Sequence, residues 1–182
     1  MSRTPTLDHP NFAAVRSAFP QASLSGTEFR GQSTLIVRPG DLHALMAFLK
    51  GRGYDFLSDV AGVDYLGYPA EMPGRFAVVY NLVNTSTEDR FFVKVFINPT
   101  LPTEGIEPDP GLVVDSVTDL WPGAEWNERE VFDMFGIRFQ GHPDLRRILT
   151  WEAYPAHPLR KDYPVRGRGE REQYRIVDRS DA

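Results

Sequence analysis

The spacing of apolar residues predicts two helices in the first third of the chain. Over residues 8–19 apolar positions recur at helical intervals, with Asp8 as the expected N-terminal cap and Pro20 as the stop. A second apolar stripe follows Asp41, the expected cap of a helix over residues 41–51. Both segments are therefore expected to pack one face against a core.

Alternating or continuous apolar runs predict strands between and after these helices. The segments 27–30 and 33–38 form a predicted pair with a turn between them, and 54–66 is a strand with an irregular middle. Two firmer strands, 76–83 and 91–97, flank a polar hairpin loop. Because the strands cluster rather than alternating with helices, the predicted fold class is α+β, a mostly antiparallel sheet with helices on one face.

From residue 116 onward the pattern changes. Residues 116–119 resemble a short capping box, and a helix is predicted over 124–135 with its stop at Gly136. The stretch that follows is rich in Pro, Arg and aromatic residues and has no clear periodicity. It cannot build a core and is expected to be stable only when laid against another surface.

These patterns divide the chain into two predicted parts. Residues 1–136 are the globular α+β domain, and residues 137–182 are an extended, Arg- and Pro-rich docking segment and tail. Seven Lys and Arg against three Asp and Glu lie within residues 138–168, although the whole chain has a net charge of −5. A solvated basic tail is the simplest alternative, and nucleic-acid binding is not expected, because it usually needs a strongly basic domain.

Composition excludes several kinds of chemistry. The chain has no Cys, which removes disulfides, Cys-ligated zinc, Cys-ligated iron–sulfur clusters and a Cys nucleophile. Its apolar runs fall short of the roughly 20 residues that a membrane-spanning helix needs. The 12 Phe residues must lie in a core or beneath a partner. A soluble protein is expected, and docking onto a membrane complex is compatible with this composition.

The predicted helix 124–135 places the Glu128 carboxylate on its apolar stripe. A carboxylate there needs a cationic partner, for which Arg146, Arg147 and Arg160 are the candidates, since guanidinium binds carboxylate in a fork. The opposite face is expected to carry Trp126, Arg129, Glu130 and Asp133. The simpler alternative is a solvated helix with incidental pairs such as Arg129–Asp133.

Catalytic and metal-binding interpretations of this region are weaker. The carboxylates of Glu128, Glu130 and Asp133 have no nucleophile beside them in the sequence, so acid–base catalysis is not favoured. His142 and His157 each precede a proline and lack the spacing of a zinc-binding helix. We therefore predict no catalytic, cofactor-binding or metal-binding residue in this chain.

Three long motifs resemble one known family. Residues 128–137, 141–149 and 158–164 look like the signature of the C subunit (the 30 kDa subunit family) of the proton-pumping NADH:quinone oxidoreductase, respiratory complex I. The resemblance extends over about residues 35–165. It implies an α+β scaffold subunit of the hydrophilic arm, which supports electron transfer from NADH through FMN and Fe–S centres to quinone.

The same resemblance implies partners and a location. The chain would hold no cofactor, with FMN and Fe–S clusters in other subunits, and would pack against the D subunit of the complex, with the B, I and G subunits nearby. It would lie peripherally on the cytoplasmic side of the bacterial inner membrane. The interface residues implied in this way are Glu128, Arg129, Glu130, Asp133, His142, Arg146, Arg147, Arg160, Lys161, Asp162 and Tyr163.

Three alternatives stay open at the level of sequence. The first is the corresponding subunit of membrane-bound hydrogenases, formate hydrogenlyases or a ferredoxin:quinone complex, which this chain cannot discriminate because the donor chemistry lies in other chains. An independent small enzyme that uses the Glu128–Asp133 carboxylates is the second alternative. A generic adaptor outside bioenergetics is the third.

Overall fold

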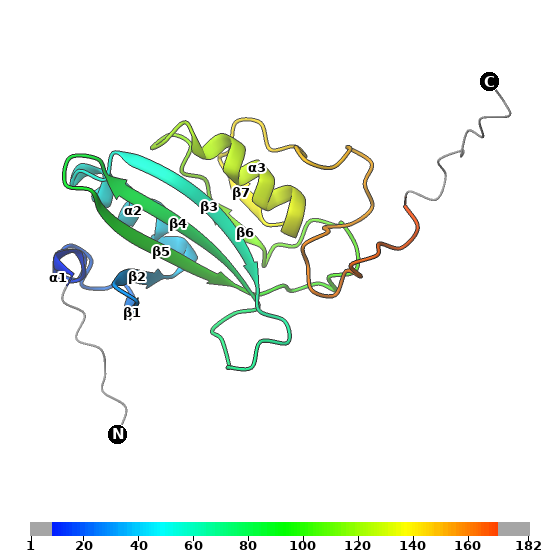
Figure 1. The fold of residues 1–182 in the computed structure, drawn as a ribbon, viewed down its shortest axis with the longest axis horizontal. Coiled ribbons are helices and arrows are strands. Elements are labelled where there is room, and N and C mark those ends of the chain that lie inside the picture. Colours follow the sequence, from blue (N-terminus) through cyan, green and yellow to red (C-terminus); the bar gives the residue numbers. More distant parts are fainter. Residues whose placement is uncertain (1–8, 171–182) are drawn as a thin grey trace, which may run out of the picture.

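Residues 9–170 are described by a computed structural model, shown in Figure 1. Within that range, three α-helices, a short 3-10 helix and seven strands follow one another along the chain. Their bounds are α1 Pro10–Ala18, β1 Ser25–Phe29, β2 Gln32–Val37, the 3-10 turn Pro39–Asp41, α2 Leu42–Gly51, β3 Phe56–Asp64, β4 Phe76–Asn84, β5 Asp89–Ile97, β6 Val113–Asp115, α3 Ala124–Phe135 and β7 Arg138–Gln140. The predicted order of helices and strands is confirmed, and the α+β class with it.

Five strands form one sheet in the order β1-β2-β5-β4-β3. Every neighbouring pair is antiparallel except β2 and β5, which run parallel. The ladder between β3 and β4 shifts register between Leu57 and Asp59, which is the irregular middle that the sequence predicts. The sequence does not predict a second, two-stranded sheet of parallel β6 and β7, because each strand is only three residues long.

One face of the large sheet carries the core. On β5 this face presents Phe91, Val93, Val95 and Ile97, all buried as predicted. The buried stripe of α2, Leu42, Leu45, Met46 and Leu49, belongs to the same cluster. In Figure 1, α2 is seen behind the strands.

Two predicted helix starts need correction. Asp41 makes no side-chain capping bond to α2, because the 3-10 turn that contains it already delivers the chain into the helix. Residues 116–119 form a turn and cap no helix, since α3 begins only at Ala124 after Gly123. At α1 the cap is the His9 side chain, which accepts the Asn11 N–H, and Asp8 lies outside the described residues.

The segment after α3 lies along the chain's own domain. Ile137 and Phe139 belong to the main hydrophobic core, so that core extends past residue 136. Further on, Tyr154 and Ala156 are buried although no helix or strand follows β7 in the described residues. The segment therefore lies against a surface of its own chain, and its role toward other proteins stays a prediction.

Candidate docking surface around Asp133

Helix α3 ends where its sequence predicts, at Gly136. This residue has a φ of 75°, the left-handed conformation that favours glycine. A Cβ at this position would also come within 2.4 Å of Arg160 Nη2 and 2.7 Å of the His157 ring. Gly136 is thus required both by the helix end and by the close approach of the segment that returns to it.

The returning segment completes the C-terminal end of α3. The last carbonyls of a helix have no partner within it and must find donors elsewhere. His157 Nδ1 lies 2.9 Å from the carbonyl oxygen of Asp133, the Leu159 N–H donates to the Met134 carbonyl at 3.1 Å, and Arg160 Nε donates to the Phe135 carbonyl at 2.7 Å. Residues 157–160 therefore act as a cap built from distant sequence.

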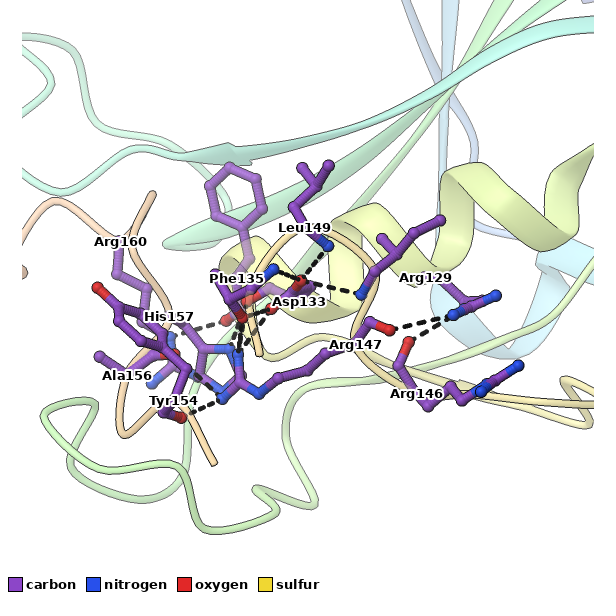
Figure 2. A network of polar contacts seen from close by, with 12 residues as sticks. Arg129, Asp133, Phe135, Arg146, Arg147, Leu149, Tyr154, Ala156, His157 and Arg160 are labelled. Atoms are coloured by element: carbon purple, nitrogen blue, oxygen red, sulfur yellow. Dashed lines mark hydrogen bonds and ion pairs between the residues drawn. The ribbon is translucent and has the colours of Figure 1, made fainter. Parts of the chain in front are cut away.

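Asp133 is the centre of the polar network in Figure 2. One carboxylate oxygen accepts the backbone N–H groups of residues 148, 149 and 150 at 2.7–3.0 Å. The other oxygen accepts the Thr150 hydroxyl at 2.5 Å and Arg147 Nη1 at 2.7 Å. Burial alone would raise the pKa of Asp133, but the hydrogen bonds from Thr150 and Arg147 lower it to about 2. Asp133 is therefore ionised and fully satisfied at neutral pH.

Arg147 connects this carboxylate to the next turn of chain. Its Nη2 donates to the carbonyl oxygens of Tyr154 at 2.8 Å and Ala156 at 3.1 Å, while Nη1 reaches Asp133. The side chain is only 7% exposed. One planar guanidinium thus joins α3 to two separate parts of the segment, which a lysine ammonium is poorly shaped to do.

The sequence pattern places two residues of α3 on the wrong face. Asp133 and Arg129 are expected on the solvent side, yet both are buried. Arg129 donates from Nε to the Arg146 carbonyl at 3.1 Å and from Nη2 to the Arg147 carbonyl at 3.0 Å, so it does not pair with Asp133. The prediction fails because α3 is covered on two sides, by the sheet and by the returning segment.

Glu128 is buried, as its place on the apolar stripe indicates, but its predicted arginine partner is wrong. The carboxylate accepts the Ser116 hydroxyl at 2.7 Å and the Val117 N–H at 2.8 Å. Burial, together with a smaller effect of the Asp119 charge, raises the pKa of Glu128 to about 7 against these hydrogen bonds. This carboxylate fixes the turn before α3 rather than the segment after it.

The other candidate arginines also have unexpected roles. Within residues 9–170, Arg160 pairs with no carboxylate; besides its bond to Phe135, it donates to the Thr103 carbonyl at 2.8 Å. Arg146 is exposed and pairs with Asp144 at 2.8 Å. An ion-pair network with arginine does exist in this region, but its carboxylate is Asp133 and its arginine is Arg147.

A second group of ion pairs, besides that of Asp133 and Arg147, holds the segment 142–163 where it passes the end of the sheet. Arg75 Nη2 binds Asp64 at 3.0 Å and Asp162 at 2.8 Å, and the Lys161 N–H donates to Asp64 at 2.8 Å. Sequence reasoning misses Arg75, because nothing in the local pattern links it to Asp162, 87 positions away. Asp162, by contrast, is among the predicted residues.

The remaining predicted residues lie around these two groups of ion pairs. Glu130 and Lys161 are exposed. His142 makes a hydrogen bond with the Glu125 carbonyl at 3.0 Å, and the Tyr163 hydroxyl lies 2.7 Å from that of Tyr154. No group of three or more His, Asp or Glu in residues 9–170 is arranged to hold a metal ion. The polar groups of this region are used in holding backbone in place, which suits protein binding.

This arrangement is that of a structural site, in which charged side chains hold irregular backbone in place. The family model of the respiratory-chain NADH dehydrogenase 30 Kd subunit matches residues 35–169. The chain belongs to that family. Within residues 9–170, no helix is both long and apolar enough to cross a membrane.

Several curated relatives carry the corresponding subunit name. The NADH-quinone oxidoreductase C subunit of Geobacter metallireducens is 41% identical over 162 residues, which cover 88% of this chain and 91% of the relative. NADH-quinone oxidoreductase subunit 5 of Thermus thermophilus is 50% identical over 128 residues, 66% of this chain. The match spans only 56% of that longer Thermus relative.

Solved structures agree with the fold. A trypsin-resistant fragment of Nqo5 superposes with a TM-score of 0.59 at 36% identity, covering 74% of this chain and 98% of the fragment. A chain of the membrane-bound sulfane sulfur reductase, an archaeal respiratory membrane complex, gives a TM-score of 0.65 and covers 93% of this chain and 94% of that one. Its identity is 23%, so this second likeness concerns the fold alone.

Proposed function

We propose that this chain is a scaffold subunit in the hydrophilic arm of a proton-translocating NADH:quinone oxidoreductase. It supports electron transfer from NADH through FMN and Fe–S centres to quinone without binding these groups itself. Family membership and the relatives named as the C subunit support this proposal. The observation that carries it is the clamped segment 142–163, in which the buried side chains of Arg147 and Arg160 bind backbone carbonyls.

The proposed docking surface is the outer side of that segment. Apolar side chains that a monomer would rarely expose lie along it, with exposed fractions of 63% for Leu149, 43% for Trp151 and 52% for Leu159. A groove of about 610 Å³ runs along residues 154–170 and is lined in part by Leu159 and Lys161. Beneath this surface, buried Asp133, Arg147 and Arg160 hold its shape, while exposed residues such as Glu130, Arg146 and Lys161 lie on it.

The D subunit of the complex is the proposed main partner, with the B, I and G subunits nearby. The chain would then lie peripherally on the cytoplasmic side of the membrane, attached through the complex. The corresponding subunit of a membrane-bound hydrogenase or of a ferredoxin:quinone complex is the alternative. The donor accepted by the purified complex, NADH through flavin or another donor, distinguishes the two.

Two adjacent arginines provide a matched test. Arg147→Ala removes the cation of a buried pair with Asp133 and is expected to cost about 3–5 kcal/mol of stability. Arg146→Ala removes only an exposed pair, worth about 0–1 kcal/mol. Blue-native gels of membranes should show much less assembled complex for Arg147→Ala and near-normal amounts for Arg146→Ala.

Turnover separates a scaffold from a catalytic role in the same experiment. NADH:quinone activity per bound flavin should be unchanged in whatever complex the Arg147→Ala variant forms. Arg147→Lys, which keeps the charge but loses the planar fork, should fall between the two alanine variants in the amount of complex assembled. Full assembly with sharply reduced turnover would overturn the scaffold assignment, and so would a stable lone chain with hydrolase activity.

A further inference from the structure

The large sheet has a second face that no helix of residues 9–170 covers. Its residues alternate with the core residues along each strand, and most of those in its central part are apolar, with Asn81 on β4 and Thr34 on β2 as polar neighbours of Phe92. The apolar side chains are Ala61 and Val63 on β3, Val79 and Val83 on β4, Phe92 and Phe96 on β5 and Ile36 on β2. All are only half-buried, and none belongs to the hydrophobic core cluster. Figure 1 looks onto this face, with α2 behind it.

A single lysine lies at the centre of this face. β5 is the middle strand of five, and Lys94 is near its midpoint, directly beside Val79 on β4 and Ile36 on β2. Phe92 and Phe96 flank it along its own strand. Lys94 is thus flanked on four sides by apolar residues of the sheet.

Lys94 has no carboxylate partner within the chain as described. Its Nζ donates to the Tyr65 hydroxyl at 3.2 Å and lies 5.7 Å from the centre of the Phe96 ring. No Asp or Glu of residues 9–170 forms an ion pair with it. A partner that covers the apolar side chains would therefore bury an unpaired cation unless it brings an anion of its own.

We infer that this open sheet face binds an amphipathic helix of another subunit, whose apolar side chains surround one Asp or Glu placed against Lys94. A helix is the usual element that covers an exposed sheet face in a layered fold. The charge of Lys94 defines the complementary charge of the partner. This inference rests on the proposed function and names a second surface, distinct from the clamped segment.

The same lysine makes a second copy of this chain a poor occupant. A two-fold axis through the middle of the face would bring two Lys94 ammonium groups together within an apolar interface. Like charges in such a place cost stability on both chains. A different subunit with a carboxylate at this point avoids that cost, and the pair with Lys94 then fixes the register of the docked helix.

Amine labelling tests the inference on the intact complex. The free wild-type chain and the complex purified from membranes are treated with an acetylating reagent, and modification of Lys94 is measured by mass spectrometry. Lys94 should be acetylated at least tenfold less in the complex than in the free chain. Lys50 on α2, which lies on neither proposed surface, gives the internal comparison.

A zero-length carbodiimide cross-linker identifies the group opposite Lys94. In the complex it should join the Lys94 amine to an Asp or Glu of another subunit, and Lys94→Arg should abolish that cross-link while retaining assembly. Lys94→Glu should lower the chain recovered in the complex at least tenfold. The matched reversal Arg16→Glu, at an exposed site on α1, should leave recovery unchanged.

The possible outcomes separate this inference from the proposed function. If the wild-type chain is absent from the complex, the proposed function fails and the inference falls with it. If the chain is present but Lys94 is labelled equally in both states, or Lys94→Glu assembles normally, only the inference is wrong. A cross-link to a second copy of the chain also overturns it. Thermal melts of the isolated variants show whether Lys94→Glu is folded, and the labelling result on the wild-type chain decides the question if it is not.

Discussion

At the scale of single residues, two buried titratable groups make opposite contributions to the pH dependence of stability. Glu128 has a pKa raised from 4.5 to about 7 by burial, and His157 has a pKa lowered from 6.5 to about 4 by burial. Both groups therefore favour their neutral forms in the folded chain. The consequence is an unusual pH dependence of stability.

The signs follow from proton binding. Between pH 4.5 and 7 the folded chain keeps a proton on Glu128 that the unfolded chain has lost, so this contribution to stability is lost as pH rises. Between pH 4 and 6.5 the unfolded chain binds a proton on His157 that the folded chain does not, so that contribution is lost as pH falls. Each is on the order of 3 kcal/mol, and over the shared range the two nearly cancel.

We predict that single substitutions reveal the pH dependence of stability that each of the two groups contributes. Urea unfolding midpoints of Glu128→Gln should rise from about pH 4.5 to 6.5, because only His157 still titrates. Midpoints of His157→Gln should instead fall over the same range. The exposed neighbour Glu130 supplies the control, since Glu130→Gln should follow the wild-type curve. Parallel curves for all four proteins would mean that neither buried group has the displaced pKa.

The sequence predicts the location of these residues better than their partners. Periodicity alone places Glu128 among apolar residues, and that placement is confirmed. Periodicity cannot predict that Ser116 and Val117 donate to the Glu128 carboxylate in place of an arginine, because these donors lie in a turn of irregular backbone. Asp133 is misplaced for a related reason: a second covering layer, made by residues 147–160, has no periodic signal.

At the scale of elements, the contact between α3 and the sheet depends on one glycine. Gly62 on β3 faces the Phe135 ring, and a Cβ at Gly62 would lie 2.4 Å from a ring carbon. That separation is far below van der Waals contact. The end of α3, and with it Asp133, is therefore held at a height over the sheet that only glycine at this position allows.

Gly62→Ala should accordingly destabilise the domain by about 1–3 kcal/mol, the usual cost of overpacking. Chemical denaturation measures the loss, and Phe135→Leu in the same chain should restore part of it by removing the ring. Gly40→Ala is the matched control, because a Cβ there would meet no other atom within 4 Å. A neutral Gly62→Ala would show that α3 can shift without cost.

Most elements are predictable from the sequence and two are not. The boundaries of α3, β4 and β5 follow from long periodic runs between clear stop signals, and the structure agrees with them. β6 and β7 are each too short to give an alternating pattern. They form a parallel pair although the whole of α3 separates them in the sequence. The local sequence of β6 contains no information about a partner strand that comes only after a complete helix in the sequence.

At the scale of the whole molecule, Arg75 ties the sheet to the C-terminal segment. Its guanidinium bridges Asp64 at the end of β3 and Asp162, and Asp64 is fully buried at its side chain. The domain and its segment are thus one folded unit over residues 9–170, in contrast to two independent parts. Docking would then need little further ordering of the segment.

We predict that Arg75→Met loosens the segment selectively. Removing the cation leaves Asp64 charged and buried, which should cost on the order of 3 kcal/mol. Limited trypsin digestion should cut after Arg160 and Lys161 much faster than in the wild type, while the sheet stays intact. Arg90→Met, at an exposed position on β5, should leave the rate of cutting after Arg160 and Lys161 unchanged. Uniform faster cutting throughout the chain would instead indicate global unfolding.

The dependence of Asp133 on later residues also bears on synthesis at the ribosome. All the groups that donate hydrogen bonds to the Asp133 carboxylate lie 14–17 positions further along the chain. A nascent or prematurely terminated product that ends before Arg147 must leave this carboxylate without its hydrogen bonds, and the interior around it cannot close. Residues 147–150 therefore complete the interior around Asp133, and a product that ends before them is expected to be cut faster by proteases than the full chain.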